Sequence, residues 1–137
     1  AGPQGGRGGE VVTGEDFDGY EGKYVSGRSS ALIPAPIGEA ALAEAKELAI
    51  ATFRALRCDG LARVDFFWED PSTEINGRPG RGFLLNEVNT MPGFTPISMF
   101  PKLWEATGMD YPELITSLVD LAIERHAKRR MHRSVKH

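Results

Sequence analysis

The sequence predicts an α+β fold in which helices pack on a mostly antiparallel sheet. Two apolar segments, residues 61–69 and 83–88, have the length and composition of strands, and a segment rich in Pro, Ser, Asn and Gly separates them. Apolar residues at helical spacing before and after this pair predict two longer helices. Because the connection between the two strands is typical of a hairpin, we expect them to be antiparallel neighbours.

The first helix is expected over residues 39–56. Pro34 and Pro36 keep the preceding chain extended, and Gly60 ends the helical pattern. Helical spacing relates the apolar residues Leu42, Ala45, Ala49, Phe53 and Leu56. This segment is therefore predicted to be amphipathic.

Two further helices are expected after the second strand. The first is short, spans residues 98–107, and is expected to be interrupted early by Pro101. The second runs from about residue 111 to 129, with Asp110 as N-cap and Glu113 at the capping-box position. Its buried stripe is predicted at Leu114, Leu118, Leu121 and Ala122.

Four polar residues lie where the two predicted strands meet: Arg63, Asp65, Glu87 and Asn89. Residues two apart in a strand share a face, and a hairpin brings the start of one strand opposite the end of the next, so all four are expected to converge. Oxygen ligands without His or Cys suit magnesium, which commonly accompanies phosphate groups. Solvated strand-end carboxylates are the alternative, although the apolar flanks favour buried strands, where a lone carboxylate is costly.

Plainer roles stay open for the other candidates. Arg63 could be only the ion-pair partner of Asp65, and Gly93 only a turn glycine after Pro92. Ser98 could be an ordinary helix cap. A Lys23–Tyr24 pair is usually solvated or packed on the surface.

Composition narrows the function classes. A chain of 137 residues with 41% hydrophobic content suits one folded, soluble domain. Cys58 is the only cysteine, which excludes an internal disulfide, and all three histidines lie after residue 125. No apolar run is long enough to cross a membrane and no signal peptide begins the sequence, so a cytoplasmic location is expected.

The two ends of the chain differ from its body. Residues 1–30 are predicted to be a flexible loop, of the kind that forms a mobile lid, with one short strand near residues 10–12, and residues 31–126 the folded body of the chain. Residues 127–137 are predicted to be a basic, disordered tail. No aromatic residue is interleaved with its charges, which disfavours nucleic-acid binding. The missing initiator Met indicates a fragment of a longer protein.

The run from Asn89 to Ser98, NTMPGFTPIS, resembles the C-terminal signature of D-alanine–D-alanine ligases, members of the ATP-grasp superfamily. The segments RVD at 63–65, EVN at 87–89 and YEGKY at 20–24 fit the same pattern in the same order. The resemblance covers roughly residues 10–125. It implies the C-terminal part of an ATP-grasp fold, with residues 1–30 as part of a lid loop and residues 31–126 as the catalytic subdomain.

The resemblance also implies roles for individual residues. Asp65, Glu87 and Asn89 would be ligands of Mg²⁺ or Mn²⁺ beside ATP, and Arg63 with the Gly93 N–H would stabilise the oxyanion. Lys23 would contact the transferred phosphate and Tyr24 would close the site. Substrate-binding residues would be Ser98 and Met99, with Ser98 holding the carboxylate of the second D-alanine.

The family's N-terminal domain and the central segment with its glycine-rich loop have no counterpart in this sequence. The resemblance therefore implies a fragment of a ligase that joins two D-alanines through an acyl phosphate for peptidoglycan precursor synthesis, homodimeric when complete and inactive alone. A D-alanine–D-lactate or other ATP-grasp ligase is the alternative, although Tyr24 favours the dipeptide product. A noncatalytic remnant is the other alternative.

Overall fold

The computed structural model describes residues 5, 10–12, 30–32 and 35–134. In chain order the elements are β1 (Glu10–Val12), β2 (Ser30–Leu32), α1 (Glu39–Ala55), β3 (Arg63–Glu69), β4 (Glu74–Ile75), β5 (Arg78–Pro79), β6 (Gly82–Asn89), α2 (Met99–Glu105) and α3 (Tyr111–Ser134). The pairs β1–β2, β3–β6 and β4–β5 are all antiparallel. The predicted α+β class and antiparallel pairing are confirmed, with the strands arranged as separate two-stranded sheets.

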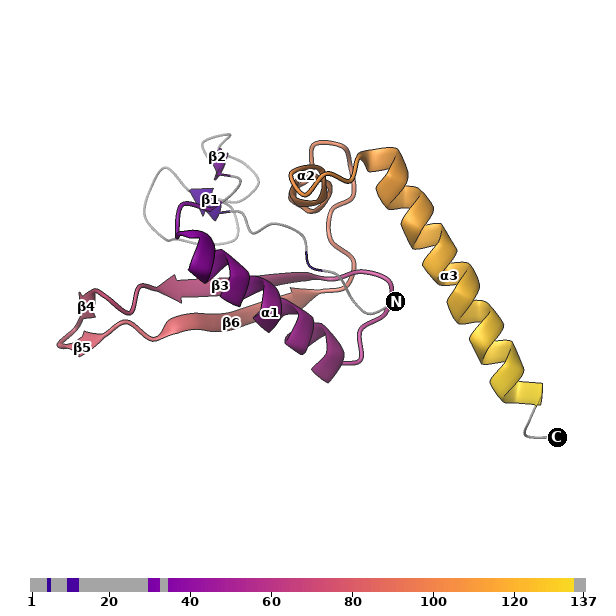
Figure 1. Ribbon diagram of the computed structural model, residues 1–137, viewed down its shortest axis with the longest axis horizontal. Helices are drawn as coiled ribbons and strands as arrows, with labels where there is room; N and C mark the ends of the chain where they lie inside the picture. Colours follow the sequence, from indigo (N-terminus) through magenta and orange to yellow (C-terminus); the bar gives the residue numbers. More distant parts are fainter. Residues whose placement is uncertain (1–4, 6–9, 13–29, 33–34, 135–137) are drawn as a thin grey trace.

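The β3–β6 ribbon and α1 form the body of the described structure. Figure 1 shows α1 lying across one face of this ribbon. Ala41 in the first turns of α1 is buried and Phe53 is half-buried, whereas Leu56, just past the helix, is 58% exposed. The predicted apolar stripe is therefore at least half-buried along α1, and only its last predicted position, Leu56, is exposed.

The apolar core is small. Within the described residues the buried apolar side chains are Ala35, Ala41, Phe100 and Leu114, together with the prolines Pro92 and Pro101. Phe67 is 47% and Leu85 53% exposed, so the expected burial of both strands is wrong at these two positions. The cause is geometric, because one helix on a two-stranded ribbon cannot cover both of its faces.

A narrow hairpin extends the ribbon beyond Glu69. Its tip is the two-residue turn Asn76–Gly77, where both residues have positive φ, 51° and 76°, between the paired Ile75 and Arg78. This combination matches the twist of the flanking strands, and Asn-Gly is the sequence that most readily adopts it. The predicted hairpin connection is thus confirmed.

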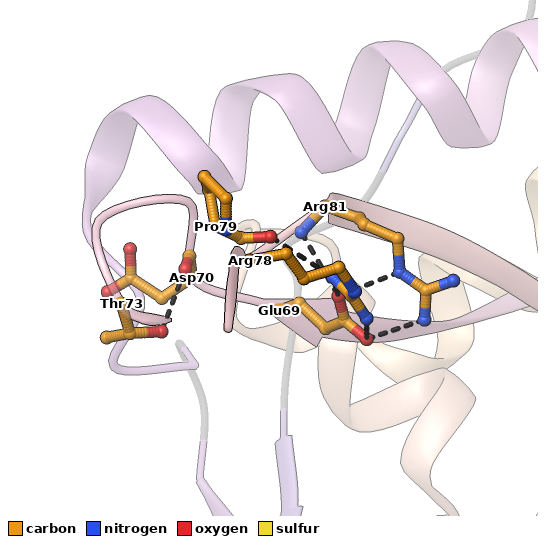
Figure 2. A network of polar contacts seen from close by, with 6 residues as sticks. All are labelled: Glu69, Asp70, Thr73, Arg78, Pro79 and Arg81. Carbon is orange, nitrogen blue, oxygen red and sulfur yellow. Dashed lines mark hydrogen bonds and ion pairs between the residues drawn. The ribbon is translucent and has the colours of Figure 1, made fainter. Parts of the chain in front are cut away.

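Glu69 connects this hairpin to the β3–β6 ribbon through ion pairs with two arginines. Its Oε2 accepts from Arg78 Nη1 and Arg81 Nε, both at 2.8 Å, and its Oε1 accepts from Arg81 Nη2 at 2.6 Å (Figure 2). Hydrogen bonds from Arg81, and then from Arg78, hold the pKa of Glu69 well below its usual range. One carboxylate thus links the end of β3 to β5 and to Arg81, the residue directly before β6.

An aromatic cluster connects helix α2 to the loop that follows β6. Phe100 packs against Phe94 and Trp104, with ring centroids 5.9 Å and 6.4 Å away. Pro101 is the third residue of α2 and leaves the helix uninterrupted, contrary to expectation. The first N–H groups of a helix have no intrahelical partner, so proline loses nothing there.

Helix α3 begins as predicted. The Glu113 N–H donates to Asp110 Oδ1 at 2.8 Å and the Asp110 N–H donates to Glu113 Oε2 at 3.1 Å, which is the reciprocal capping box. Leu114 is buried, and α2 is the element against which α3 packs.

Beyond its first turns α3 departs from expectation. Leu121 and Ala122 are exposed, so the predicted stripe is wrong past Leu118. The helix continues to Ser134, so a disordered tail from residue 127 is wrong up to that residue. Figure 1 shows α3 projecting from the body. Midway along its length, Arg125 Nη2 forms an ion pair with Asp59 Oδ2 at 2.8 Å. Among the helices of the described residues, none has the length and apolar character to cross a membrane.

Candidate active site

The four predicted polar residues at the strand ends do converge. In the β3–β6 register Arg63 stands opposite Asn89, and Asp65 opposite Glu87. Residues paired across an antiparallel ladder project to the same face, and Arg63 and Asp65 are two apart in one strand. All four side chains therefore belong to one face at one end of the ribbon.

A bulge in β6 lies directly beside this polar cluster. Asp65 pairs with Glu87 while Phe66 pairs with Leu85, so Asn86 is an extra residue without a partner in β3. In a regular strand Leu85 and Glu87 would share a face. The bulge separates them, which keeps Leu85 with Phe66 and moves Glu87 to the side of Asp65. Nothing in the sequence signalled this irregularity.

Arg63 binds Asp65 closely and Glu87 loosely. Arg63 Nε donates to Asp65 Oδ1 and Arg63 Nη2 to Asp65 Oδ2, both at 2.9 Å. The same Nη2 lies 3.7 Å from Glu87 Oε1. The side chains of Arg63 and Asp65 are 28% and 30% exposed and that of Glu87 is 53% exposed. One guanidinium thus lies between carboxylates from both strands.

Asn89 joins this cluster to the following loop. Its Oδ1 accepts the Met91 N–H at 2.9 Å, which turns the chain directly after β6. One lone pair of Oδ1 remains for another partner.

Gly93 and Ser98 approach each other across the loop. A Cβ added to Gly93 would lie 3.2 Å from Ser98 Oγ, a tight contact. Positive φ is found at other described glycines and not at Gly93. Space beside Ser98, and not an unusual φ, is therefore the reason that the structure gives for a glycine at this position.

Ser98 occupies the N-cap position of α2, but its side chain makes no capping hydrogen bond. Instead Ser98 Oγ accepts the Thr95 N–H at 3.0 Å and lies 2.7 Å from Thr95 Oγ1. The plain cap interpretation is therefore wrong, because the hydroxyl faces back into the loop. Met99, half-buried, begins the helix.

Tyr111 is a supporting residue that the sequence did not reveal. Its hydroxyl donates to the Phe94 carbonyl oxygen at 2.7 Å, and the two rings are 5.6 Å apart. The first residue of α3 therefore holds the middle of the loop that carries Gly93 and Ser98. A tyrosine directly after a helix N-cap gives no sequence signal for this contact.

Lys23 and Tyr24 lie outside the described residues, as does most of the segment predicted to be a lid. Their proposed roles remain predictions.

The donor set fits a hard divalent cation. Asp65 and Glu87 supply carboxylates, and Asn89 a carboxamide oxygen, on one face. The part of the chain that the structure describes has no group of three or more His, Cys, Asp or Glu able to hold a metal. Magnesium commonly uses one or two carboxylates and completes its shell with waters and substrate phosphates, so the smaller set suffices.

Comparisons with protein families, sequences and solved structures all find similarity to D-alanine–D-alanine ligases. A family model described as D-ala D-ala ligase C-terminus matches residues 3–120. A D-alanine--D-alanine ligase of Acetivibrio thermocellus is 45% identical over 118 residues, which covers 86% of this chain and 29% of the relative.

Two solved structures are also similar. The D-alanine-D-alanine ligase from Coxiella burnetii is 36% identical with a TM-score of 0.68, and the match covers 78% of this chain and 28% of that one. The VanG D-Ala:D-Ser ligase from Enterococcus faecalis is 32% identical with a TM-score of 0.67, covering 85% and 31%. This chain spans about three tenths of the length of these proteins.

The family match extends over most of the chain and includes both strands of the polar cluster and the loop from Asn89 to Ser98. This chain belongs to the family of D-alanine–D-alanine ligase C-terminal domains.

Proposed function

We propose that this chain supplies the metal- and phosphate-handling part of an ATP-dependent ligase that joins two D-alanines. The observation that carries the proposal is the convergence of Arg63, Asp65, Glu87 and Asn89 on one face, directly before the loop that holds Gly93 and Ser98. Carboxylates, a guanidinium and backbone donors, without a nucleophile, suit phosphoryl and acyl transfer by positioning and charge neutralisation.

Each residue has a distinct part in this proposal. Asp65, Glu87 and Asn89 would hold Mg²⁺ or Mn²⁺ beside the phosphates of ATP, where the ion would offset phosphate charge. Arg63 and the Gly93 N–H would stabilise the oxyanion that forms when the amino group of the second D-alanine attacks the acyl phosphate of the first. Lys23 and Tyr24 would contact the phosphate and exclude water.

Ser98 and Met99 are proposed to bind the second substrate. Ser98 would offer its hydroxyl to the carboxylate of the second D-alanine. The similarity to a structure titled as a D-Ala:D-Ser ligase makes D-serine an alternative second substrate that an assay must include. D-lactate is another.

The complete enzyme would need further polypeptide. This chain spans 29% of its Acetivibrio thermocellus relative, and we propose that a nucleotide would lie between this part and a second lobe. The complete ligase is proposed to be a cytoplasmic homodimer. Proximity and water exclusion both require the second lobe, so the chain alone should neither hydrolyse ATP nor form a dipeptide.

A chimeric ligase tests the function. Residues 3–120 would replace the matching segment of the Acetivibrio thermocellus relative, and phosphate release would be followed with D-alanine, D-serine or D-lactate as second substrate. Phosphate release that depends on D-alanine, together with formation of D-alanyl-D-alanine, is the expected result. A folded chimera that binds ATP yet releases phosphate with none of these substrates would refute the proposal.

A further inference from the structure

The roles proposed for Arg63 and Asp65 conflict in the observed geometry. Arg63 donates to both oxygens of Asp65, with Nε to Oδ1 and Nη2 to Oδ2 each at 2.9 Å. A guanidinium held in this bidentate fork has its Nε–H and an Nη2–H committed to Asp65, and these donors are not available to an acyl oxyanion. Both carboxylate oxygens of Asp65 already accept a hydrogen bond from Arg63, so the lone pairs on that side are not available to a metal ion.

The position of the guanidinium resembles that of a bridging cation. Its Nη2 is shared between Asp65 Oδ2 on β3 and, at 3.7 Å, Glu87 Oε1 on β6. These are the two carboxylates that would share a divalent ion. Arg63 therefore supplies the positive charge between them in the structure described.

The Arg63 guanidinium and a divalent metal ion would compete for these two carboxylates. Magnesium binds carboxylate oxygen at about 2.1 Å, so an ion on an oxygen that still accepts from Arg63 would lie within about 5 Å of the donating nitrogen. Two positive charges that close repel each other strongly at a site only partly exposed to water.

We propose that Arg63 is a place-holder for the divalent cation. Its guanidinium bridges Asp65 and Glu87 while no cation is bound, and it leaves Asp65 when one binds, so that metal loading presents Arg63 to the acyl oxyanion. This coupling rests on the proposed function. Because linkage is reciprocal, the hold of Arg63 on Asp65 must weaken metal binding in the absence of substrate.

Mn²⁺ binding to the full chain, measured from the free-ion EPR signal without nucleotide, tests the coupling independently of activity. The wild-type chain should bind Mn²⁺ in a manner that Asp65→Asn abolishes. Arg63→Met, which keeps most of the side-chain volume, should tighten binding by about tenfold, since it removes a charge beside the ion. Arg54→Met changes the same charge on the exposed surface of α1 and should leave binding unaltered.

A second measurement needs no variant. The Nε–H of Arg63 donates to Asp65, and the Nε–H of Arg81 donates to Glu69 at 2.8 Å, so Arg81 provides an internal reference. Adding Mg²⁺ should shift the Nε–H NMR signal of Arg63 and leave that of Arg81 in place.

The outcomes separate this inference from the proposed function. Asp65-dependent Mn²⁺ binding that Arg63→Met does not tighten, with an unmoved Arg63 signal, overturns the place-holder role and leaves the metal ligands standing. Mn²⁺ binding that Asp65→Asn does not change overturns the ligand assignment itself, and the coupling with it.

Discussion

Tyr111 and Phe94 are joined through both a ring contact and a hydrogen bond, with the Tyr111 hydroxyl 2.7 Å from the Phe94 carbonyl oxygen. Phe94 follows Gly93 in the loop, and Tyr111 opens α3. The position of the proposed oxyanion donor thus depends on a helix seventeen residues further along the chain.

Tyr111→Phe should therefore loosen the loop while leaving the aromatic packing intact. The expected loss is about 1 kcal/mol of unfolding free energy, the usual value for one hydrogen bond. Urea unfolding and amide exchange over residues 90–98 measure both effects. Thr116→Val removes a hydroxyl that donates to the Pro112 carbonyl on the exposed side of α3 and should leave loop exchange unchanged. Equal exchange in both variants would show that Tyr111 does not order the loop.

Glu69→Gln should make stability less dependent on pH. Hydrogen bonds from Arg81 and Arg78 lower the pKa of Glu69 below its ordinary 4.5 in the folded chain. The stabilisation is therefore complete above the unfolded pKa and is lost as the pH falls toward the folded value. Urea midpoints of the wild type and the variant should differ most at about pH 7, and the difference should shrink progressively as the pH falls below about 5. Glu74→Gln, in the same hairpin, is the control, and a wild-type advantage over Glu69→Gln that does not shrink between about pH 7 and about pH 3 would contradict this assignment.

Arg63→Lys in the chimeric ligase should reduce the rate more than substrate affinity. An ammonium lacks the planar fork of donors, so stabilisation of the oxyanion suffers while ground-state binding does not. Loss of one such donor typically lowers kcat on the order of 100-fold to 1000-fold. Steady-state kinetics at varied D-alanine concentration give kcat and KM separately. A change confined to KM would assign Arg63 to ground-state binding.

Ser98→Ala should weaken binding of the second D-alanine and leave the first site and ATP nearly unchanged. Thr95→Val is the matched comparison, because it removes the hydroxyl that lies 2.7 Å from Ser98 Oγ while keeping Ser98. Separate KM values for the two D-alanine sites of the chimeric ligase measure the effect. If both variants weaken the second site equally, Ser98 acts by ordering the loop and does not contact the substrate.

The sequence predicted the fold class and the convergence of the polar cluster because both follow from local patterns. Alternation and a hairpin-type connection were sufficient to bring Arg63 and Asp65 opposite Glu87 and Asn89. The bulge at Asn86 escaped prediction, since it depends on how two strands match their side chains over their whole length. The alternative that Ser98 is a plain helix cap is wrong, and the sequence could not show this because a cap and a loop contact have the same sequence signature.

The length of α3 was misjudged for a related reason. The basic composition after Glu124 predicts a disordered tail from residue 127, yet the helix continues through these residues to Ser134. Glu124 and Lys128 form an i,i+4 pair at 2.5 Å, which stabilises a helix that has little to pack against. Apolar spacing at Leu121 and Ala122 predicted burial, but burial requires a partner, which the described part of the chain does not supply there.

The central claim, that Glu87 helps to form the metal and phosphate site, is tested most directly by Glu87→Gln in the chimeric ligase. The variant keeps the side-chain shape and removes the carboxylate that faces Asp65 across the ribbon. Glu74→Gln makes the same chemical change on the exposed hairpin. D-alanine-dependent phosphate release at saturating Mg²⁺ should be lost in Glu87→Gln and retained in Glu74→Gln. Near-normal phosphate release by a folded Glu87→Gln chimera would contradict the account.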